Sequence, residues 1–191
     1  EALCASLREL APRYDAVIVV DFGHGMLGPE AIGILCEGAR FLAVNAQSNA
    51  GNLGYHAISR YPRADYICIT ENEMRLEARD RRGDLEPIVA DVARRLGARR
   101  VTVTRGNQGC FCYAPDEGVV EVPALAGQVV DRMGAGDAVL AVTSLCVAQG
   151  APLEIVGFIG NAVGAQAVAT VGNRTPIDRA GLSKHIVALL K

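Results

Sequence analysis

The sequence has few of the features that mark several large classes of protein. Its 191 residues contain no tryptophan, and 19 lysines and arginines nearly balance 21 aspartates and glutamates, which leaves a formal net charge of −2. Proteins that bind nucleic acid or anionic membranes usually carry a basic face, and this balance gives no sign of one. We therefore expect neither nucleic acid nor a membrane as a partner.

The six cysteines lack the spacing of a disulfide framework or of a zinc site. Only Cys110 and Cys112 lie close together, in a C-x-C that a strand would place on one face, and the three histidines are far from them in sequence. Buried, reduced thiols are the simplest interpretation, and they favour a cytoplasmic protein. We assign no residue as a direct metal ligand.

Long hydrophobic runs of the kind that cross a membrane are also missing. Two uncharged stretches, 138–153 and 155–173, contain polar residues and many glycines, so they indicate core helices of a soluble domain. The first ten residues, "EALCASLREL", carry charges and lack the pattern of a signal peptide. They predict a helix that is entered partway through a longer protein.

Short apolar runs alternate with helical patterns in the first half of the chain. The apolar runs are hydrophobic on successive residues, as in strands buried on both faces of a parallel sheet. Pro29 opens the first helical pattern and Gly97 closes the last. The alternation predicts an α/β fold. The expected strands are 16–20, 41–44, 66–70 and 101–104, and the expected helices are 29–39, 71–82 and 87–97.

The pattern changes after Gly106. Residues 109–115 and 118–124 read as two short strands joined at "DEG", a hairpin signal. Three helical segments follow, near 136–149, 153–171 and 178–190. Because no repeat, low-complexity tract or linker separates these parts, we treat 1–191 as one domain.

The stretch "VVDRMGAGDAVLA", residues 129–141, places very small residues before a helix and an acid in its first turn. The first N–H groups of a helix have no intrahelical partner, so Gly134, Ala135 and Gly136 could form an anion hole for a phosphoryl group. Asp137 would then lie beside an incoming hydroxyl. Alternatively, Asp137 only caps the helix and the glycines allow close packing. The tetrapeptide alone does not decide between these readings.

Four segments together resemble the ribokinase-like (PfkB) carbohydrate kinases. "DRMGAGDAVLA" is similar to the family signature D-T-T-G-A-G-D-A, and "VTRGNQG" (103–109) to its V-T-x-G-x-x-G segment. "ITENE" (69–73) resembles the T-P-N-x-x-E region, and "GNAVGAQA" (160–167) resembles the helix beside the adenine. Their order and approximate spacing agree with the family, which implies a ribokinase-like fold with a mainly parallel sheet flanked by helices.

The resemblance implies a kinase that uses ATP and Mg²⁺ and assigns a role to each matching residue. Asp137 would be the catalytic base, and the amides of Gly134, Ala135 and Gly136 would form the anion hole. Asp131 would help to hold a monovalent cation or the sugar. The remaining matches would contact the metal and phosphate region (Asn72) or the nucleotide (Thr104, Gly106, Gly109 and Asn161).

Within that family, two further segments resemble the heptose-7-phosphate kinase group. They are "VVDFGHGML" (19–27) and "VNAQSNAGN" (44–52), and they suggest a sugar or sugar phosphate, such as a heptose phosphate, as the acceptor. Asp21, at the end of a strand, could face a ligand or could cap a loop.

The likeness runs from about residue 15 to about residue 176 but matches only the later part of the family's domain. We therefore expect a partial domain with an exposed sheet edge, which could pair with a missing N-terminal segment or with another copy.

The sequence departs from the family at several positions. Arg75 stands where N-x-x-E has its glutamate, and either Glu73 or Glu77 could substitute for that acid. Alternatively, the spacing predicts ordinary salt bridges, Glu71 with Arg75 and Glu77 with Arg81.

Other departures fall at positions that the family gives to lysine or threonine. His24 and Gln47 replace two lysines, and Arg132 and Met133 replace two threonines. Arg132 could clamp a phosphate or point into solvent. These departures keep two alternatives open: a catalytically impaired nucleotide- or sugar-binding module, and a structural half-domain without nucleotide binding.

Overall fold

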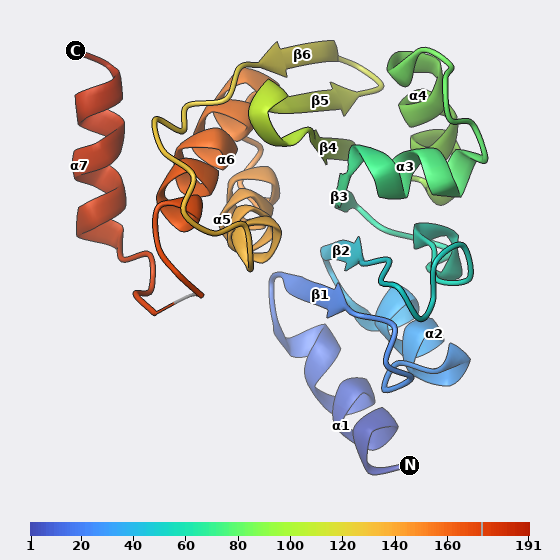
Figure 1. Ribbon diagram of the computed structural model, residues 1–191. Coiled ribbons are helices and arrows are strands. Elements are labelled where there is room, and N and C mark those ends of the chain that lie inside the picture. Colours follow the sequence, from blue (N-terminus) through green and yellow to red (C-terminus); the bar gives the residue numbers. More distant parts are fainter. Residues whose placement is uncertain (173) are drawn as a thin grey trace.

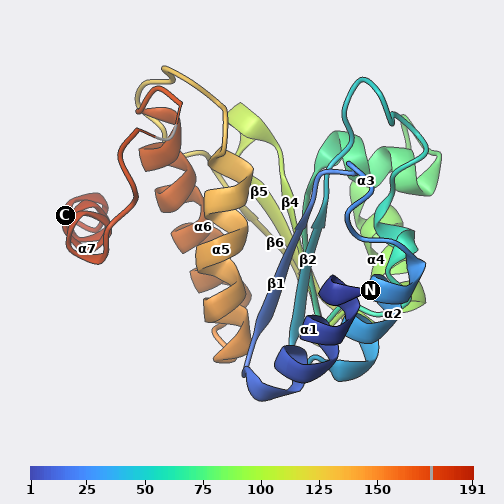
Figure 2. The same cartoon turned by 90° about the horizontal axis from the view of Figure 1, so that it is seen from below.

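The computed structural model describes residues 1–172 and 174–191, and it has three layers (Figures 1 and 2). Seen along the sheet, helices α1 to α4 cover one face, and α5 and α6 cover the other. Helix α7 packs on the outside of α6. The predicted α/β fold is therefore confirmed.

The sheet contains six strands in the order of the chain, β1-β2-β3-β4-β5-β6. The first four pair in parallel, and β5 and β6 add an antiparallel hairpin at one edge. Strand β1 pairs only with β2 among the described residues, so it is the exposed edge that the sequence predicts. The strands are β1 (Val17–Asp21), β2 (Leu42–Ala46), β3 (Tyr66–Thr70), β4 (Arg100–Thr104), β5 (Cys110–Ala114) and β6 (Gly118–Val122).

The connections between the parallel strands explain why their helices share one face. Because crossovers between parallel strands are right-handed and the strand order never reverses, successive helices fall on the same side. Their apolar residues and those of the sheet form the larger core cluster, which includes Leu35, Val89 and Val92. These helices are α2 (Pro29–Gly38), α3 (Glu71–Ala78) and α4 (Leu85–Leu96), and α1 (Ala2–Leu10) packs on α2.

The opposite face is covered by helices that follow the sheet in sequence. α5 (Ala135–Ala148) and α6 (Leu153–Val168) pack closely on each other and on the strands, around Leu140, Val156 and Val163. α7 (Arg179–Leu189) is the last of the described helices along the chain. None of the described helices is long and apolar enough to cross a bilayer.

Helix α3 is shorter than the sequence predicts. The charged pattern indicates a helix to residue 82, but α3 ends at Ala78 because Arg79 adopts a left-handed conformation with φ of 52°. Asp80 then accepts hydrogen bonds from the N–H groups of Arg82 and Gly83 in a turn. The predicted pair of Glu77 with Arg81 is accordingly wrong, and Glu77 instead pairs with Arg95 of α4 at 2.9 Å.

Candidate functional site

A large cavity lies where the carboxyl ends of β3 and β4 meet the first turn of α5. It has a volume of about 780 Å³, within the range of small-molecule sites. Its walls come from α3, the β4–β5 turn, the segment before α5, and α6. The residues assigned by resemblance that line it are Asn72, Thr104, Gly106, Gly109, Ala135, Gly136 and Asn161.

The start of α5 has the backbone geometry of an anion site. Gly134 precedes the helix with φ of 74°, and no side chain caps this end. No protein acceptor is bonded by the N–H groups of Gly136 or Asp137 in the described part of the chain. A Cβ built on Gly136 meets nothing within 4 Å, so this glycine is not required for packing. Asp137 thus makes no capping hydrogen bond at this end, and its catalytic role stays a prediction.

The Asp137 side chain contacts Gln47, the residue that follows the end of β2. The side chain of Gln47 donates a hydrogen bond from Nε2 to Oδ1 of Asp137 at 2.6 Å. Burial raises the pKa of Asp137, and the hydrogen bond from Gln47 opposes this effect, with a net increase. A half-buried carboxylate of raised proton affinity is suited to accept a proton from a bound hydroxyl.

The first turn of α3 brings Asn72 to the cavity and is held by a capping box. Thr70 accepts a hydrogen bond from the N–H of Glu73, whose carboxylate accepts from the Thr70 N–H in return. This arrangement leaves Asn72 exposed at the cavity wall.

The predicted pair of Glu71 and Arg75 is present in this turn, at 2.8 Å. Arg105 also binds Glu71, at 3.1 Å. Burial tends to raise the pKa of Glu71, but its hydrogen bonds to the two arginines outweigh burial and lower it.

The acids near the cavity do not form a metal cage. Besides capping α3, Glu73 accepts a hydrogen bond from the Ser48 N–H, and Glu77 binds Arg95 and the Ser59 N–H. No cluster of three or more histidine, cysteine, aspartate or glutamate side chains suited to a metal occurs among the residues described. Mg²⁺ in kinase sites is usually held by one or two carboxylates together with substrate phosphates and water, and we assign no residue here as its ligand.

The residues assigned to the nucleotide differ in what they contact. Gly109 is a close-approach position, since a Cβ there would lie 2.0 Å from the Val122 carbonyl oxygen. Asn161 donates from Nδ2 to the carbonyl oxygens of Val122 and Pro123, at 2.9 and 3.0 Å. Asn161 thus holds the segment that leaves β6, which forms part of the cavity wall. The nucleotide contacts themselves stay predictions.

Asp131 and Arg132, which precede the glycines, lie in different surroundings. The Asp131 carboxylate accepts from the Met133 N–H at 3.0 Å and from the Gly172 N–H at 2.9 Å, and so joins this loop to the segment after α6. Its role toward a cation or a sugar stays a prediction. Arg132 is exposed and lines the large cavity, whereas Gly134 lines a smaller neighbouring one.

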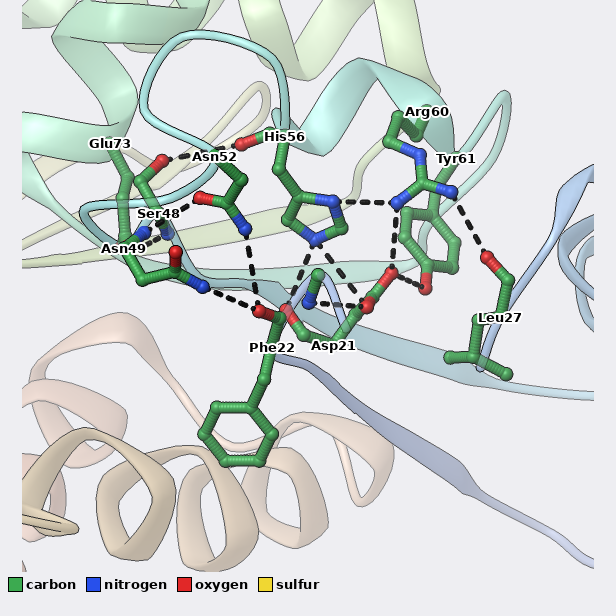
Figure 3. A network of polar contacts seen from close by, with 11 residues as sticks. Asp21, Phe22, Leu27, Ser48, Asn49, Asn52, His56, Arg60, Tyr61 and Glu73 are labelled. Atoms are coloured by element: carbon green, nitrogen blue, oxygen red, sulfur yellow. Dashed lines mark hydrogen bonds and ion pairs between the residues drawn. The ribbon is translucent and has the colours of Figure 1, made fainter. Parts of the chain in front are cut away.

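A buried polar cluster beside the end of β1 was not predicted from the sequence (Figure 3). Asp21 accepts hydrogen bonds from the Gly23 N–H at 3.0 Å and from the Tyr61 hydroxyl at 2.8 Å. His56 lies 3.4 Å from the same carboxylate, and Arg60 lies 3.6 Å from it. Of the two roles considered for Asp21, the contacts favour the loop-capping one.

Comparison with known proteins agrees with this arrangement. A sequence profile described as pfkB family carbohydrate kinase matches residues 45–180. The chain is similar to the bifunctional protein HldE of Koribacter versatilis, with 32% identity over 93% of this chain and 36% of that protein. It is also similar to the HldE protein of Desulfatibacillum aliphaticivorans, with 30% identity over 97% of this chain and 38% of that protein.

Solved structures show the same fold at lower identity. Phosphofructokinase-2 from Escherichia coli, in complex with substrates and products, superposes with a TM-score of 0.79 and 17% identity, over 100% of this chain and 62% of that chain. A nucleoside kinase from Burkholderia thailandensis in complex with inosine gives 0.74 and 21%, over 98% and 62%.

The matches thus span little more than a third of the curated relatives and about three fifths of the solved chains. The family profile itself covers well over half of the residues described above, including the cavity and the first turn of α5. On this evidence the chain belongs to the pfkB family of carbohydrate kinases, with the ribokinase-like fold.

Proposed function

We propose that the protein transfers the γ-phosphoryl group of ATP to a hydroxyl group of a sugar or sugar phosphate. The observation that carries the proposal is the position of Asp137 in the first turn of α5, whose uncapped N–H groups lie beside a cavity of about 780 Å³. A half-buried acid next to backbone donors is the arrangement that phosphoryl transfer to an alcohol requires.

The transfer exchanges one phosphorus–oxygen bond for another. The acceptor oxygen forms a bond to the γ-phosphorus while the bond to the β,γ-bridging oxygen breaks, and ADP leaves with that oxygen. Asp137 takes the proton of the acceptor hydroxyl. Of the predicted anion-hole amides, the Ala135 N–H donates to the Arg132 carbonyl oxygen at 3.4 Å, and Gly134 lines the smaller cavity. The N–H of Gly136, joined by that of Asp137, would stabilise the charge on the transferring group, each contributing about 3 kcal/mol.

The size and the lining of the cavity support ATP as the phosphoryl donor. Ala135 and Gly136 leave the helix N-terminus open to phosphates, and Asn72 and Arg132 add polar groups. The apolar side chains of Val139, Ala165 and Val168 supply a surface suited to a base. Magnesium would add charge neutralisation on the phosphates.

The acceptor is proposed from the resemblance of residues 19–27 and 44–52 to heptose kinases. The similarity to HldE proteins supports this choice, at identities near 30%. The complete natural protein should be incubated with ATP labelled in the γ-phosphate, Mg²⁺ and a panel of heptose phosphates, hexose phosphates and free sugars. Label transferred to at least one acceptor, and lost in Asp137→Asn, is the expected result.

Two other outcomes correspond to the alternatives raised by the sequence. ATP binding in calorimetry without transfer to any acceptor would indicate the catalytically impaired module. The arguments for it are Arg75 at the position of an expected acid, and His24 and Gln47 at the positions of expected lysines. Neither binding nor transfer would indicate a structural half-domain. Both outcomes contradict the kinase proposal.

A further inference from the structure

The hydrogen bond between Gln47 and Asp137 joins two parts of the chain that lie 90 positions apart. Gln47 follows the last residue of β2, and Asp137 lies in the first turn of α5. Only Oδ1 of Asp137 accepts this bond, and no described protein group donates to Oδ2. One carboxylate oxygen is thus fixed, and the other is free for a bound ligand.

The backbone of Gln47 is itself held in place. Its N–H donates to the Asp21 carbonyl oxygen at 2.9 Å, which continues the pairing of β2 with β1 beyond the last strand residue. The Asp21 side chain is fixed in turn by Gly23 and Tyr61. Burial and the nearby carboxylate raise the pKa of Tyr61, so its hydroxyl remains a donor.

His56 adds a second contact to the same carbonyl oxygen (Figure 3). Arg60 lies 2.6 Å from Nδ1 of His56, and because arginine can only donate, Nδ1 must accept. Nε2 then acts as the donor, and it lies 3.2 Å from the Asp21 carbonyl oxygen. His56 is only 4% exposed, so this contact is shielded from water and fixes the Asp21 carbonyl oxygen, to which the Gln47 N–H also donates.

Resting on the kinase function proposed above, we propose that Gln47 is the positioning residue for Asp137, orienting its carboxylate toward the acceptor hydroxyl and tuning its proton affinity. Gln47 is not itself a catalytic residue, because the Gln47 amide contacts the base and not the reacting atoms. This role accounts for the hydrogen bond that the Gln47 side chain donates to Asp137 of α5.

The electrostatic surroundings of Asp137 give Gln47 this influence. Burial raises the pKa of Asp137, and the hydrogen bond from Gln47 lowers it. Burial raises the pKa of Cys68, the thiol facing α5 from β3, to about 12, so it stays neutral. The other titratable or charged groups on elements that pack against α5, or precede it, are Asp21, Tyr66, Asp131, Arg132 and Glu154.

The position of Gln47 also corresponds to one of the lysines in the heptose-kinase pattern. A lysine there would place a positive charge beside the base and lower its pKa further than an amide does. Gln47 therefore leaves Asp137 with a higher proton affinity than that pattern would give. Exchanging this one side chain tests both the orientation and the proton affinity of Asp137.

The experiment uses pH profiles of kcat for variants of the complete protein, with the acceptor found in the labelling assay. Gln47→Ala should lower kcat by about 10- to 100-fold, leave the KM for ATP within about twofold, and move the acid limb to higher pH, since the bond that lowers the pKa is lost. Gln47→Lys should move that limb to lower pH. Gln47→Glu should move it to higher pH because two adjacent carboxylates cannot both ionise easily.

Gln149→Ala is the matched control. Gln149 is an exposed glutamine at the opposite, carboxyl end of α5 and lies outside every segment assigned to the site. The control should keep the native profile. An unmoved acid limb in all three Gln47 variants, or equal kcat losses in Gln47→Ala and Gln149→Ala without a pH shift, would overturn the inference. If Asp137→Asn is inactive in that case, the kinase proposal still stands, whereas an active Asp137→Asn removes both.

Discussion

Arg75 and Glu71 form a salt bridge one turn apart on α3, with Nε of the arginine 2.8 Å from Oε1 of the glutamate. Arg75 also donates to the Gly83 carbonyl oxygen at 2.9 Å, and so holds the turn that follows α3. The residue at the position of an expected acid therefore has a structural role away from the cavity wall. That role accounts for its presence without any contact to a nucleotide.

Arg75→Ala should have a small effect. The two side chains are 21% and 25% exposed, and partly exposed pairs contribute about 1 kcal/mol or less. We expect a lower free energy of unfolding by that amount in urea titrations, with kcat within about twofold of the native value. A loss of kcat beyond tenfold, at unchanged stability, would instead assign Arg75 to the phosphate site.

Gly136→Ala separates the anion-hole interpretation from a packing role. Nothing lies within 4 Å of the added Cβ, so stability should be unchanged or rise by up to about 1 kcal/mol, as for alanine in a helix. The methyl group would intrude where a phosphate binds, and kcat/KM for ATP should fall by about 10- to 100-fold. Gly33→Ala in α2, where the new Cβ also meets nothing, is the control and should keep full activity. Equal kinetics in both variants would reject the anion hole.

His56→Ala tests the buried cluster beside β1. The change removes one partner from Asp21 and one from Arg60, and the loss of buried hydrogen bonds costs about 1–3 kcal/mol. Because His56 contacts the Asp21 carbonyl oxygen that also accepts from the Gln47 N–H, kcat should fall as well, with the KM for ATP nearly unchanged. Chemical denaturation and steady-state kinetics give the two readouts. A free energy of unfolding equal to that of the native protein would contradict the stabilising role of His56 in this cluster.

The raised pKa of Asp137 also predicts how stability depends on pH. The folded state binds the Asp137 proton more tightly than the unfolded state, whose value is near 3.8. The stability linked to this group is thus fully present below that pH and is lost as pH rises through the folded pKa. Asp137→Asn should unfold at higher urea concentration than the native protein near neutral pH, with the difference vanishing below about pH 3.8. A constant difference across pH would contradict the assignment.

Much of the fold follows from local patterns in the sequence. The four parallel strands are continuous apolar runs, and the β5–β6 hairpin is marked by "DEG", so both were predicted within one or two residues. The pair of Glu71 and Arg75 follows from helical spacing. The prediction of a Glu77–Arg81 pair was wrong because Arg79 ends α3 in a left-handed conformation, which a local charge pattern does not reveal.

The site was predictable only in part. Its glycines and Asp137 fall in a recognisable signature, and most of the assigned residues line the cavity. The contacts of Gln47 and His56 were not predictable, because they join β2, the loop after it and α5 without a shared period or motif. The partner of a polar residue in that loop is known only from the folded sheet, which places Gln47 beside Asp137 and His56 beside Asp21.

The central claim, that Asp137 is the base of a phosphoryl transfer, is tested most directly by comparing Asp137→Asn with the native form of the complete protein. The asparagine can still accept the hydrogen bond from Gln47 but cannot take a proton. Turnover should fall by roughly 10²- to 10⁴-fold, while ATP affinity measured by calorimetry stays nearly the same. Turnover equal to that of the native protein would contradict the claim.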